Sequence, residues 1–355
     1  MNEPISAARQ GAPTIADVAR LAGVSTMTVS RVLNSRGRVH ESTRQIVDAA
    51  ISALNYTPSS AARSLAGIST IRIGLLCSKP SGYLSELLLG SLEQAGRIDA
   101  QLVVEKCRIG DHEADIARHL VESGVDGVIL PPPLCDSRAV LDVLLAARIP
   151  VVVVASAVPR GKVLAVMIDD FRASFAMTSH LLALGHERIG FIGGDPHQTV
   201  SERRFAGYCA ALKSQGIALD DQVIAKGMFT YRSGLDATEI LLDVPGPPSA
   251  IFACNDDMAA AAVAVAQRRG LDVPADLTVC GFDDTPIATT IWPALTTIRQ
   301  PTAAMARAAV ELLGATIRGT PLGEGGRHRL MDFTLVRRQS DSAPRRRPIM
   351  RSAIG

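Results

Sequence analysis

The sequence lacks the short motifs that mark most enzymes and metalloproteins. It contains no G-x-G-x-x-G, no P-loop, no G-x-S-x-G and no H-E-x-x-H. Its seven histidines do not cluster, and His186, which precedes a strand, is best explained as a capping or packing residue. The six cysteines are scattered singly without a C-x-x-C and are expected to be small buried thiols. We therefore expect no metal, no cofactor and no enzymatic activity.

Long hydrophobic runs are also missing. No uncharged run reaches the roughly 18 residues of a membrane-spanning helix, and residues 1–13 lack the apolar stretch of a leader. We expect a cytoplasmic protein, associated with the nucleoid, that has no membrane partner.

Charge of one sign is in only slight excess. The formal net charge of the 355 residues is +2, which does not by itself predict a polyanionic partner. Residues 1–66, however, carry seven arginines against four acidic residues, an excess of the sign that phosphates attract. A chain of this length exceeds one ordinary core, so two or three domains are expected.

The first part of the chain is predicted to be all-helical. After a flexible arm (1–13), residues 14–57 contain three helical stretches, with Thr14 and Ser25 as N-caps and Gly23 as a helix end. The third begins near Glu41. Residues 58–69 form a short stub and linker: Pro58 stops the chain and Gly67 ends the stub.

From residue 70 to 340 continuous apolar strands alternate with helices, which predicts parallel α/β sheets covered on both faces. Two successive sets of strands indicate two lobes, about 70–168 plus 298–325 and about 169–297 plus 326–340. Three crossover strands near 165–170, 293–300 and 328–336 should join them. Residues 341–355, rich in proline and arginine, are expected to be a basic disordered tail, solvated or touching DNA.

The second helical stretch presents one polar arc. Val29, Val32 and Leu33 fall together on a helix, and the opposite arc holds Thr26, Met27, Ser30, Arg31 and Asn34. Helix, glycine turn and second helix form a helix-turn-helix, whose second helix enters the major groove. Arg31 can donate two hydrogen bonds to guanine, Thr26 and Met27 can meet base edges, and Ser25, Thr28 and Ser30 suit phosphates. The alternative is a helical hairpin with an incidental surface methionine.

The stretches "TIADVARLAGVSTMTVSRVLN", "TRQIVDAAISALNYTPSSAARSLAG", "CNDDMAAA", "CGFDDT" and "PALTTIRQP" resemble the lactose/galactose repressor (LacI/GalR) family of bacterial transcription regulators. The resemblance runs through nearly the whole chain and implies a helix-turn-helix head with a two-lobed, periplasmic-binding-protein-like core. It assigns base contacts to Thr26, Met27 and Arg31. It assigns backbone contacts to Thr14, Ser25, Thr28, Asn34 and Arg38.

The stub from Ser59 to Gly67 is too short to be a stable isolated helix and should fold when paired on DNA. The resemblance implies a minor-groove hinge helix in which Leu65 wedges between base pairs, with Ala61 and Ala62 allowing close helix approach. Burial of Leu65 in a dimer is the alternative.

Polar residues gather at the predicted strand ends, where ligands bind in open α/β sheets. Through its likeness to periplasmic sugar-binding proteins, the resemblance places an effector between the lobes. The implied effector-binding residues are Tyr83, Leu84, Asp170, Arg204, Phe229, Asn255 and Asp283. A salt bridge between the lobes is the alternative for Arg204 and Asp283, and ordinary packing for Phe229 and Tyr83. Ser156 stands where some sugar-binding members have aspartate, which leaves the ligand open.

The sequence therefore predicts a homodimeric repressor of carbohydrate-utilisation genes that a sugar releases from a palindromic operator. Regulators responding to purines, nucleosides, organic acids or a co-repressor remain alternatives, as does a cytoplasmic small-molecule-binding protein without DNA binding. The effector, its direction of action, the operator, the target genes and the choice between dimer and tetramer are left open.

Overall fold

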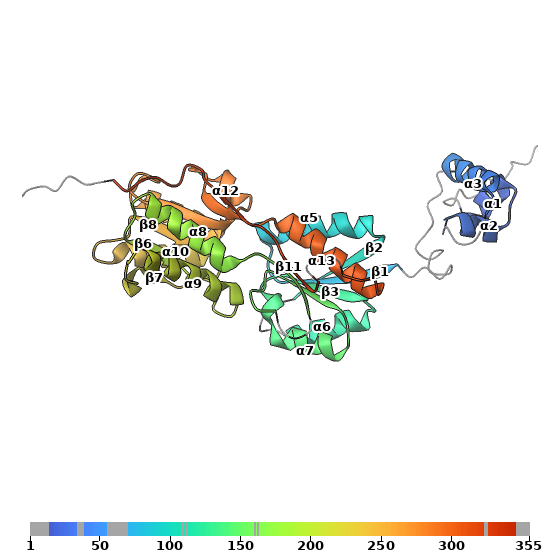
Figure 1. The fold of residues 1–355 in the computed structure, drawn as a ribbon, viewed down its shortest axis with the longest axis horizontal. Helices are drawn as coiled ribbons and strands as arrows, with labels where there is room; N and C mark the ends of the chain where they lie inside the picture. The colour runs from blue at the N-terminus through green and yellow to red at the C-terminus, as the bar shows by residue number, and fades with distance from the viewer. Residues whose placement is uncertain are drawn as a thin grey trace, which may run out of the picture. The chain divides into compact units, whose positions relative to one another are not determined.

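The computed structural model describes residues 14–33, 39–54, 70–107, 110, 112–159, 161, 163–322 and 326–345 (Figure 1). The chain divides after Thr70 into two compact units, a head and a core. The arm, the stub with Ala61, Ala62 and Leu65, and the predicted contacts Asn34 and Arg38 lie outside the described residues.

The head consists of helices α1 (Ile15–Ala22), α2 (Thr26–Leu33) and α3 (Glu41–Ala53). Thr14 and Asp17 form a capping box at the start of α1, and Gly23 ends that helix with a φ of +65°. Val18, Val29 and Val47, one from each helix, are fully buried against one another. The three predicted helices and their apolar faces are confirmed.

The first lobe contains a six-stranded sheet in the order β11-β5-β4-β3-β1-β2. Its strands are β1 (Ile71–Cys77), β2 (Ala100–Lys106), β3 (Gly127–Leu130), β4 (Val151–Val154), β5 (Leu164–Met167) and β11 (His328–Leu330), all paired in parallel. Helices α5 (Gly82–Arg97) and α13 (Thr302–Ile317) cover one face (Figure 1). Helices α6 (Glu113–Glu122) and α7 (Arg138–Ala146), with the 3-10 turn η1 (Leu134–Asp136), cover the other.

The second lobe repeats this plan in the order β12-β10-β9-β8-β6-β7. Its strands are β6 (Ile189–Ile192), β7 (Ile224–Ala225), β8 (Ala250–Ala253), β9 (Thr278–Asp283), β10 (Thr296–Arg299) and β12 (Thr334–Val336), of which only β12 runs antiparallel among the described pairs. Helices α8 (Asp170–Ala183) and α9 (Thr199–Ser214) pack together. Helices α10 (Tyr231–Asp243) and α11 (Asp256–Arg268) also pair, and η2 (Asp221–Val223) and α12 (Ile287–Thr290) are short.

Three segments cross between the lobes, after β5, after β10 and between β11 and β12, where they were predicted. The lobe boundaries need correction at the later two crossings. Residues 298–299 belong to the second lobe because they complete β10, and residues 328–330 belong to the first because β11 pairs with β5.

The predicted disordered tail begins too early. Asp341 is buried and bonded to His180 and Thr296, so residues 341–345 are part of the core; residues 346–355 lie outside the described part of the chain. Composition marked this segment as disordered, but its serines and aspartate find partners on the second lobe. No helix of the described residues is long and apolar enough to cross a bilayer.

Candidate DNA-reading helix and effector site

Helix α2 shows the two-sided character expected from its sequence. Val29 and Val32 are buried, whereas Thr26, Met27 and Arg31 are exposed, Met27 by 64%. Because it is exposed, the apolar side chain of Met27 does not provide the stabilising free energy that its burial in the three-helix core would give. The side chains proposed to read bases are therefore available on one surface of the head.

The hydroxyl groups that were predicted to contact the DNA backbone also form hydrogen bonds within the head. Ser25 Oγ accepts the amide of Thr28 at 3.1 Å and lies 3.0 Å from Thr28 Oγ1, so Ser25 caps α2 as predicted. Thr14 Oγ1 donates to Asp17 Oδ2 at 2.7 Å, which commits that hydroxyl to the α1 cap. Ser30 is half-buried and also engaged.

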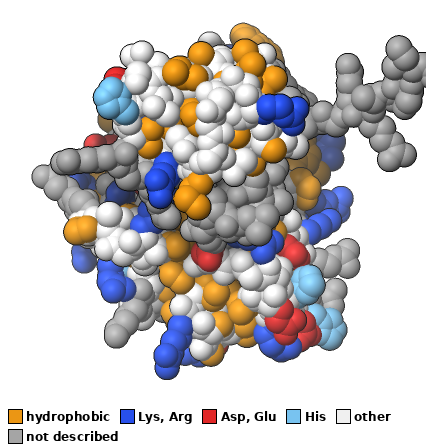
Figure 2. All heavy atoms as spheres, turned by 90° about the vertical axis from the view of Figure 1, so that its right-hand side faces the viewer, with side chains coloured by type: hydrophobic (Ala, Val, Ile, Leu, Met, Phe, Trp, Pro, Cys, Tyr) orange, Lys and Arg blue, Asp and Glu red, His pale blue; other side chains and the backbone are white. Residues whose placement is uncertain are grey.

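The lysine and arginine side chains visible in Figure 2 stand apart, among polar and apolar groups. In the head, Arg20 is paired with Asp17 at 2.7 Å. Recognition by this surface would therefore rest on a few placed side chains more than on bulk charge.

Several polar side chains lie around Arg204, near the carboxyl ends of the second lobe's strands. We call this group the polar cluster; its members are Tyr83, Asp170, Arg204, Asp283 and Gln300. Arg204, on α9, is 3% exposed and donates through Nε to Asp170 Oδ1 at 2.8 Å and through Nη1 to the carbonyl of Cys254 at 2.5 Å. Its guanidinium lies over the Phe282 ring, 3.6 Å from the centroid. This arrangement fixes the side chain before any ligand arrives.

Asp283 ends β9 beside this guanidinium, 3.7 Å from Arg204 Nη1, and accepts Gln300 Nε2 at 2.7 Å. Arg204 and Asp283 both belong to the second lobe, so the alternative of a salt bridge between the lobes is wrong. Tyr83, from α5 of the first lobe, packs against the core, and its hydroxyl is buried.

Two polar atoms of the cluster have no hydrogen-bond partner among the described residues. They are the hydroxyl of Tyr83 and Oε1 of Gln300, both buried. A buried polar group without a partner is costly, so a ligand that supplied a donor to Gln300 and a partner to Tyr83 would recover that cost.

Burial governs the protonation of the acids here. It raises the pKa of Asp283 to about 7, although Arg204 and Gln300 oppose the rise. Burial also raises the pKa of Asp170 against the opposing effect of Arg204. For Arg204, burial favours the neutral form, but Asp170 and Asp283 outweigh it and raise the pKa. Burial, with help from Asp283, lifts the pKa of Tyr83 well above its usual value.

Phe229 and Asn255, both predicted effector contacts, adjoin the polar cluster. The Phe229 ring lies against Gly194, where a Cβ would collide with it, and its centroid is 5.7 Å from the Arg204 guanidinium carbon. Asn255 caps α11 through Met258 and donates to the Phe229 carbonyl at 3.2 Å, which holds Phe229 at a φ of +54°.

Leu84, predicted beside Tyr83 as an effector contact, is buried on α5, and its amide donates to Ser81 Oγ at 3.1 Å.

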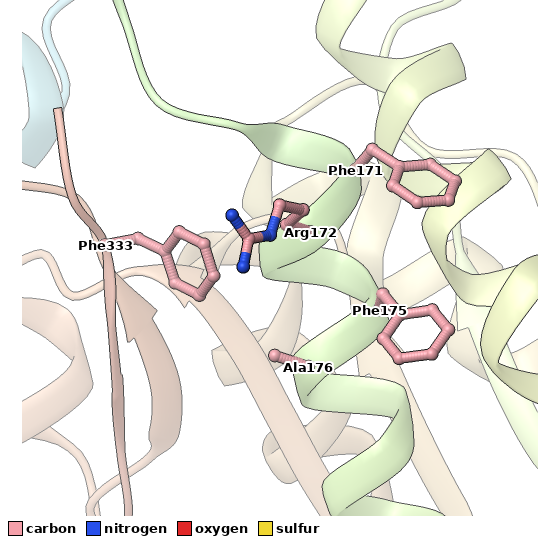
Figure 3. A pocket seen from close by; sticks show the side chains of 5 residues that line it. All are labelled: Phe171, Arg172, Phe175, Ala176 and Phe333. Atoms are coloured by element: carbon pink, nitrogen blue, oxygen red, sulfur yellow. The ribbon is translucent and has the colours of Figure 1, made fainter. Parts of the chain in front are cut away.

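A separate pocket lies outside this region. It has a volume of about 350 Å³ and is lined by Phe171, Arg172, Phe175, Ala176 and Phe333. Figure 3 shows Arg172 and Ala176 on the side of α8 that faces Phe333, and the other two rings on the far side of that helix. This pocket has one guanidinium among apolar walls, whereas the polar cluster brings several hydrogen-bonding groups together.

Three residues were not identified from the sequence. Gln300 belongs to the polar cluster, and Asp136 forms a hydrogen bond with the backbone amide of Thr199. Gln300 directly follows β10, and Asp136 follows β3 after a short loop. The rule that ligands gather at strand ends, applied to every strand, would have included both. Thr199 offers no such signal, because its role depends on a partner 63 residues away.

Known proteins match both parts of the chain. The model described as "Bacterial regulatory proteins, lacI family" matches residues 14–59, and that of a periplasmic binding protein-like domain matches residues 178–340. The HTH-type transcriptional regulator DegA of Bacillus subtilis (strain 168) is 35% identical over 310 residues, 86% of this chain and 92% of its own length.

Solved structures agree with these matches. The transcriptional regulator CelR in complex with cellobiose superposes with a TM-score of 0.71 at 31% identity, covering 92% of this chain and 99% of that one. The Lac repressor dimer bound to operator and the anti-inducer ONPF gives 0.76 at 28% identity, covering 94% and 100%.

A helix-turn-helix head joined to a two-lobed ligand-binding core defines a DNA-binding transcription regulator, not an enzyme. The chain belongs to the lacI family of bacterial regulatory proteins.

Proposed function

We propose that this protein is a cytoplasmic, homodimeric repressor that binds a palindromic operator through α2 and is released by a sugar bound at the polar cluster. The observation that carries the proposal is the cluster itself: a fixed guanidinium and two unpartnered buried polar atoms, on the same chain as an exposed recognition helix.

On the DNA side, Arg31, Thr26 and Met27 are assigned the base contacts, and Thr14, Ser25 and Thr28 the backbone contacts. The exposure of the first three supports this assignment. An arginine near the middle of the recognition helix can bind guanine O6 and N7 through two hydrogen bonds.

On the effector side, the charges of the polar cluster favour a neutral ligand. Two carboxyl groups, Asp170 and Asp283, face the single cation Arg204, so an organic acid would meet repulsion that a polyol would not. Gln300 Oε1 and the Tyr83 hydroxyl match the hydroxyl groups of a sugar, and Phe229 offers a ring face. The cellobiose complex of CelR supports the same class of ligand.

The exposed apolar surface of the first lobe supports a dimer. Leu89 and Leu92, three residues apart on α5, are 68% and 54% exposed, and Val104 is exposed on the neighbouring edge strand β2. One helix-turn-helix buries too little surface for specific binding, so two heads on a two-fold site are needed. The dimeric Lac repressor structure supports this assembly.

The test is a fluorescence-anisotropy titration of the DNA upstream of the protein's own gene, repeated at fixed salt with a panel of monosaccharides and disaccharides. We expect binding at least tenfold tighter than to random duplex, weakened by one class of sugar. Arg31→Ala should reduce this preference by about 1–3 kcal/mol. Equal binding to both DNAs would contradict the regulator, and specific binding that no sugar alters would redirect the search to purines, nucleosides, organic acids and co-repressors.

A conservative variant checks the site. Tyr83→Phe removes only the unpartnered hydroxyl, so operator binding without sugar should match the parent while a higher sugar concentration is needed for release. An unchanged sugar response would remove Tyr83 from the effector contacts.

A further inference from the structure

Asp136 joins the two lobes at the carboxyl ends of their strands. It belongs to η1, which follows β3 in the first lobe, and its Oδ2 accepts the backbone amide of Thr199, in the second lobe, at 2.9 Å. Thr199 Oγ1 lies 3.1 Å from Asp136 Oδ1 and 3.0 Å from Oδ2, within donating distance of both. Both residues are half-buried, so water competes only partly for these bonds.

The Asp136 carboxylate caps helix α9, whose own N-cap residue forms no side-chain capping bond. Thr199 is the first residue of the 16-residue helix α9, and Gln198, at the N-cap position, makes no side-chain capping bond. The first amides of a helix have no partner within it and carry partial positive charge, which a carboxylate stabilises. In α9 this carboxylate comes from the other lobe.

Thr199 also accepts a hydrogen bond in return. The backbone amide of Ala157, in the first lobe just after β4, donates to Thr199 Oγ1 at 2.9 Å. Ser156 Oγ donates to Asp136 Oδ1 at 2.6 Å and holds the carboxylate from its own lobe. One threonine thus joins the second lobe to two different loops of the first.

We infer that Asp136, Thr199 and the Ala157 amide form a latch that holds the two lobes together at this edge and sets how readily they separate. Arg204 lies five residues further along α9, about 7.5 Å along the helix axis, so opening the latch would let the second lobe, with α9 and the cluster's cation, move relative to the first. The link to effector control rests on the function proposed above, whereas the latch itself needs neither effector nor DNA. An effector that bridges the lobes would act on the same equilibrium.

The deciding experiment is hydrogen exchange, read by mass spectrometry or NMR on the full chain without ligand. Two of the hydrogen bonds between the lobes have a backbone amide as donor, that of Thr199 and that of Ala157, so each can be followed directly. Asp136→Ala should speed exchange of the Thr199 and Ala157 amides at least tenfold. Thr199→Val removes the acceptor of only one bond, so the Ala157 amide should lose protection while the amide of residue 199 keeps it. Asp142→Ala is the matched control, because it removes an exposed carboxylate on α7 of the same lobe, and it should change neither amide by more than about twofold.

Small-angle scattering on the same samples measures lobe separation. We expect a larger radius of gyration for Asp136→Ala than for the parent and the Asp142→Ala control. The inference is overturned if both amides already exchange as fast in the parent as in Asp136→Ala, if the radius is unchanged, or if lost protection extends into strands β4 and β6, which would show a contact that supports the fold of each lobe. Because no DNA or sugar is present, failure here leaves the proposed repressor standing, and failure of operator binding leaves the latch standing.

Discussion

At the scale of single residues, Asp283 combines an unusual backbone with an unusual carboxyl group. Its φ of +109° and that of Asp284, +59°, fall where side-chain-bearing residues are rarely found. Asp256 holds this turn by accepting both the amide of Thr285, at 2.7 Å, and its hydroxyl, at 3.1 Å. This turn therefore places Asp283 in the polar cluster. The unfavourable backbone conformation of Asp283 and Asp284 lowers the stability of the folded protein.

The pH dependence of stability follows from this burial. The pKa of Asp283 is about 7 in the folded protein against an ordinary value of 3.8, so the folded state binds more protons between these values. The contribution of this group to stability is therefore complete below about pH 4 and is lost as the pH rises through about 7. Asp283→Asn cannot ionise and should flatten this fall, leaving the variant more stable than the parent by a few kcal/mol at about pH 8.

Urea unfolding of both proteins from about pH 5 to about pH 8 measures the effect. If the two curves of unfolding free energy against pH run parallel, Asp283 does not carry the proposed shift.

At the scale of elements, the segment 337–345, here called the C-terminal strap, fastens the second lobe. His180 on α8 bonds Asp341 at 2.8 Å, Ser340 Oγ accepts the amide of Thr296 at 2.8 Å, and His186 Nε2 lies 2.8 Å from the carbonyl oxygen of Ser342. The last contact confirms that His186 is a packing residue. The strap thus ties helix α8 to strands β9 and β10, on which the polar cluster is built.

Removing the Asp341 carboxylate from the C-terminal strap should destabilise the protein. Asp341→Ala leaves His180 and the Thr296 hydroxyl without their buried partner, so the free energy of unfolding should fall by about 1–3 kcal/mol at neutral pH. Burial alone would raise the pKa of Asp341, but hydrogen bonds from His180 and Thr296 and the charge of Arg337 lower it. The carboxylate is therefore ionised at neutral pH. Its contribution to stability is lost only as the pH falls below about 3.8.

The matched control is Asp236→Ala, which removes an exposed ion pair with Arg232 on α10 and should change stability by less than about 1 kcal/mol. Urea unfolding compares the two. Equal losses would mean that the strap contributes no more than a surface pair.

At the scale of the whole molecule, the function proposed for the protein requires two copies. Leu92→Glu places a charge in the exposed leucine surface of α5 and should shift sedimentation toward the monomer and weaken operator binding at least tenfold. Leu145→Glu changes a leucine that is 40% exposed on α7, against the opposite face of the same sheet, and should do neither. A dimer that survives Leu92→Glu would place the interface elsewhere.

Elements were predictable from the sequence where the physical cause is local. The Thr14 N-cap, the Gly23 helix end and the continuous apolar strands, of which β4 is an example, lie within a few residues of their causes, and each is confirmed. The pairing of Asp170 with Arg204, 34 residues apart, and of Asp136 with Thr199, 63 apart, depends on how distant segments meet. The strand-end rule located the region of the polar cluster, but it could not assign the hydrogen bonds within it.

The three crossings between the lobes also bear on how the protein is made. All described elements of the head are present once residue 54 has been synthesised, whereas the first sheet must wait for β11, at residues 328–330, before its last strand is in place. Since domains generally fold as units during synthesis, from the N-terminus onward, a nascent chain has a finished reading head long before it has a finished sensor. The head of a growing chain is therefore complete while both sheets of the core still lack their last strands, β11 and β12.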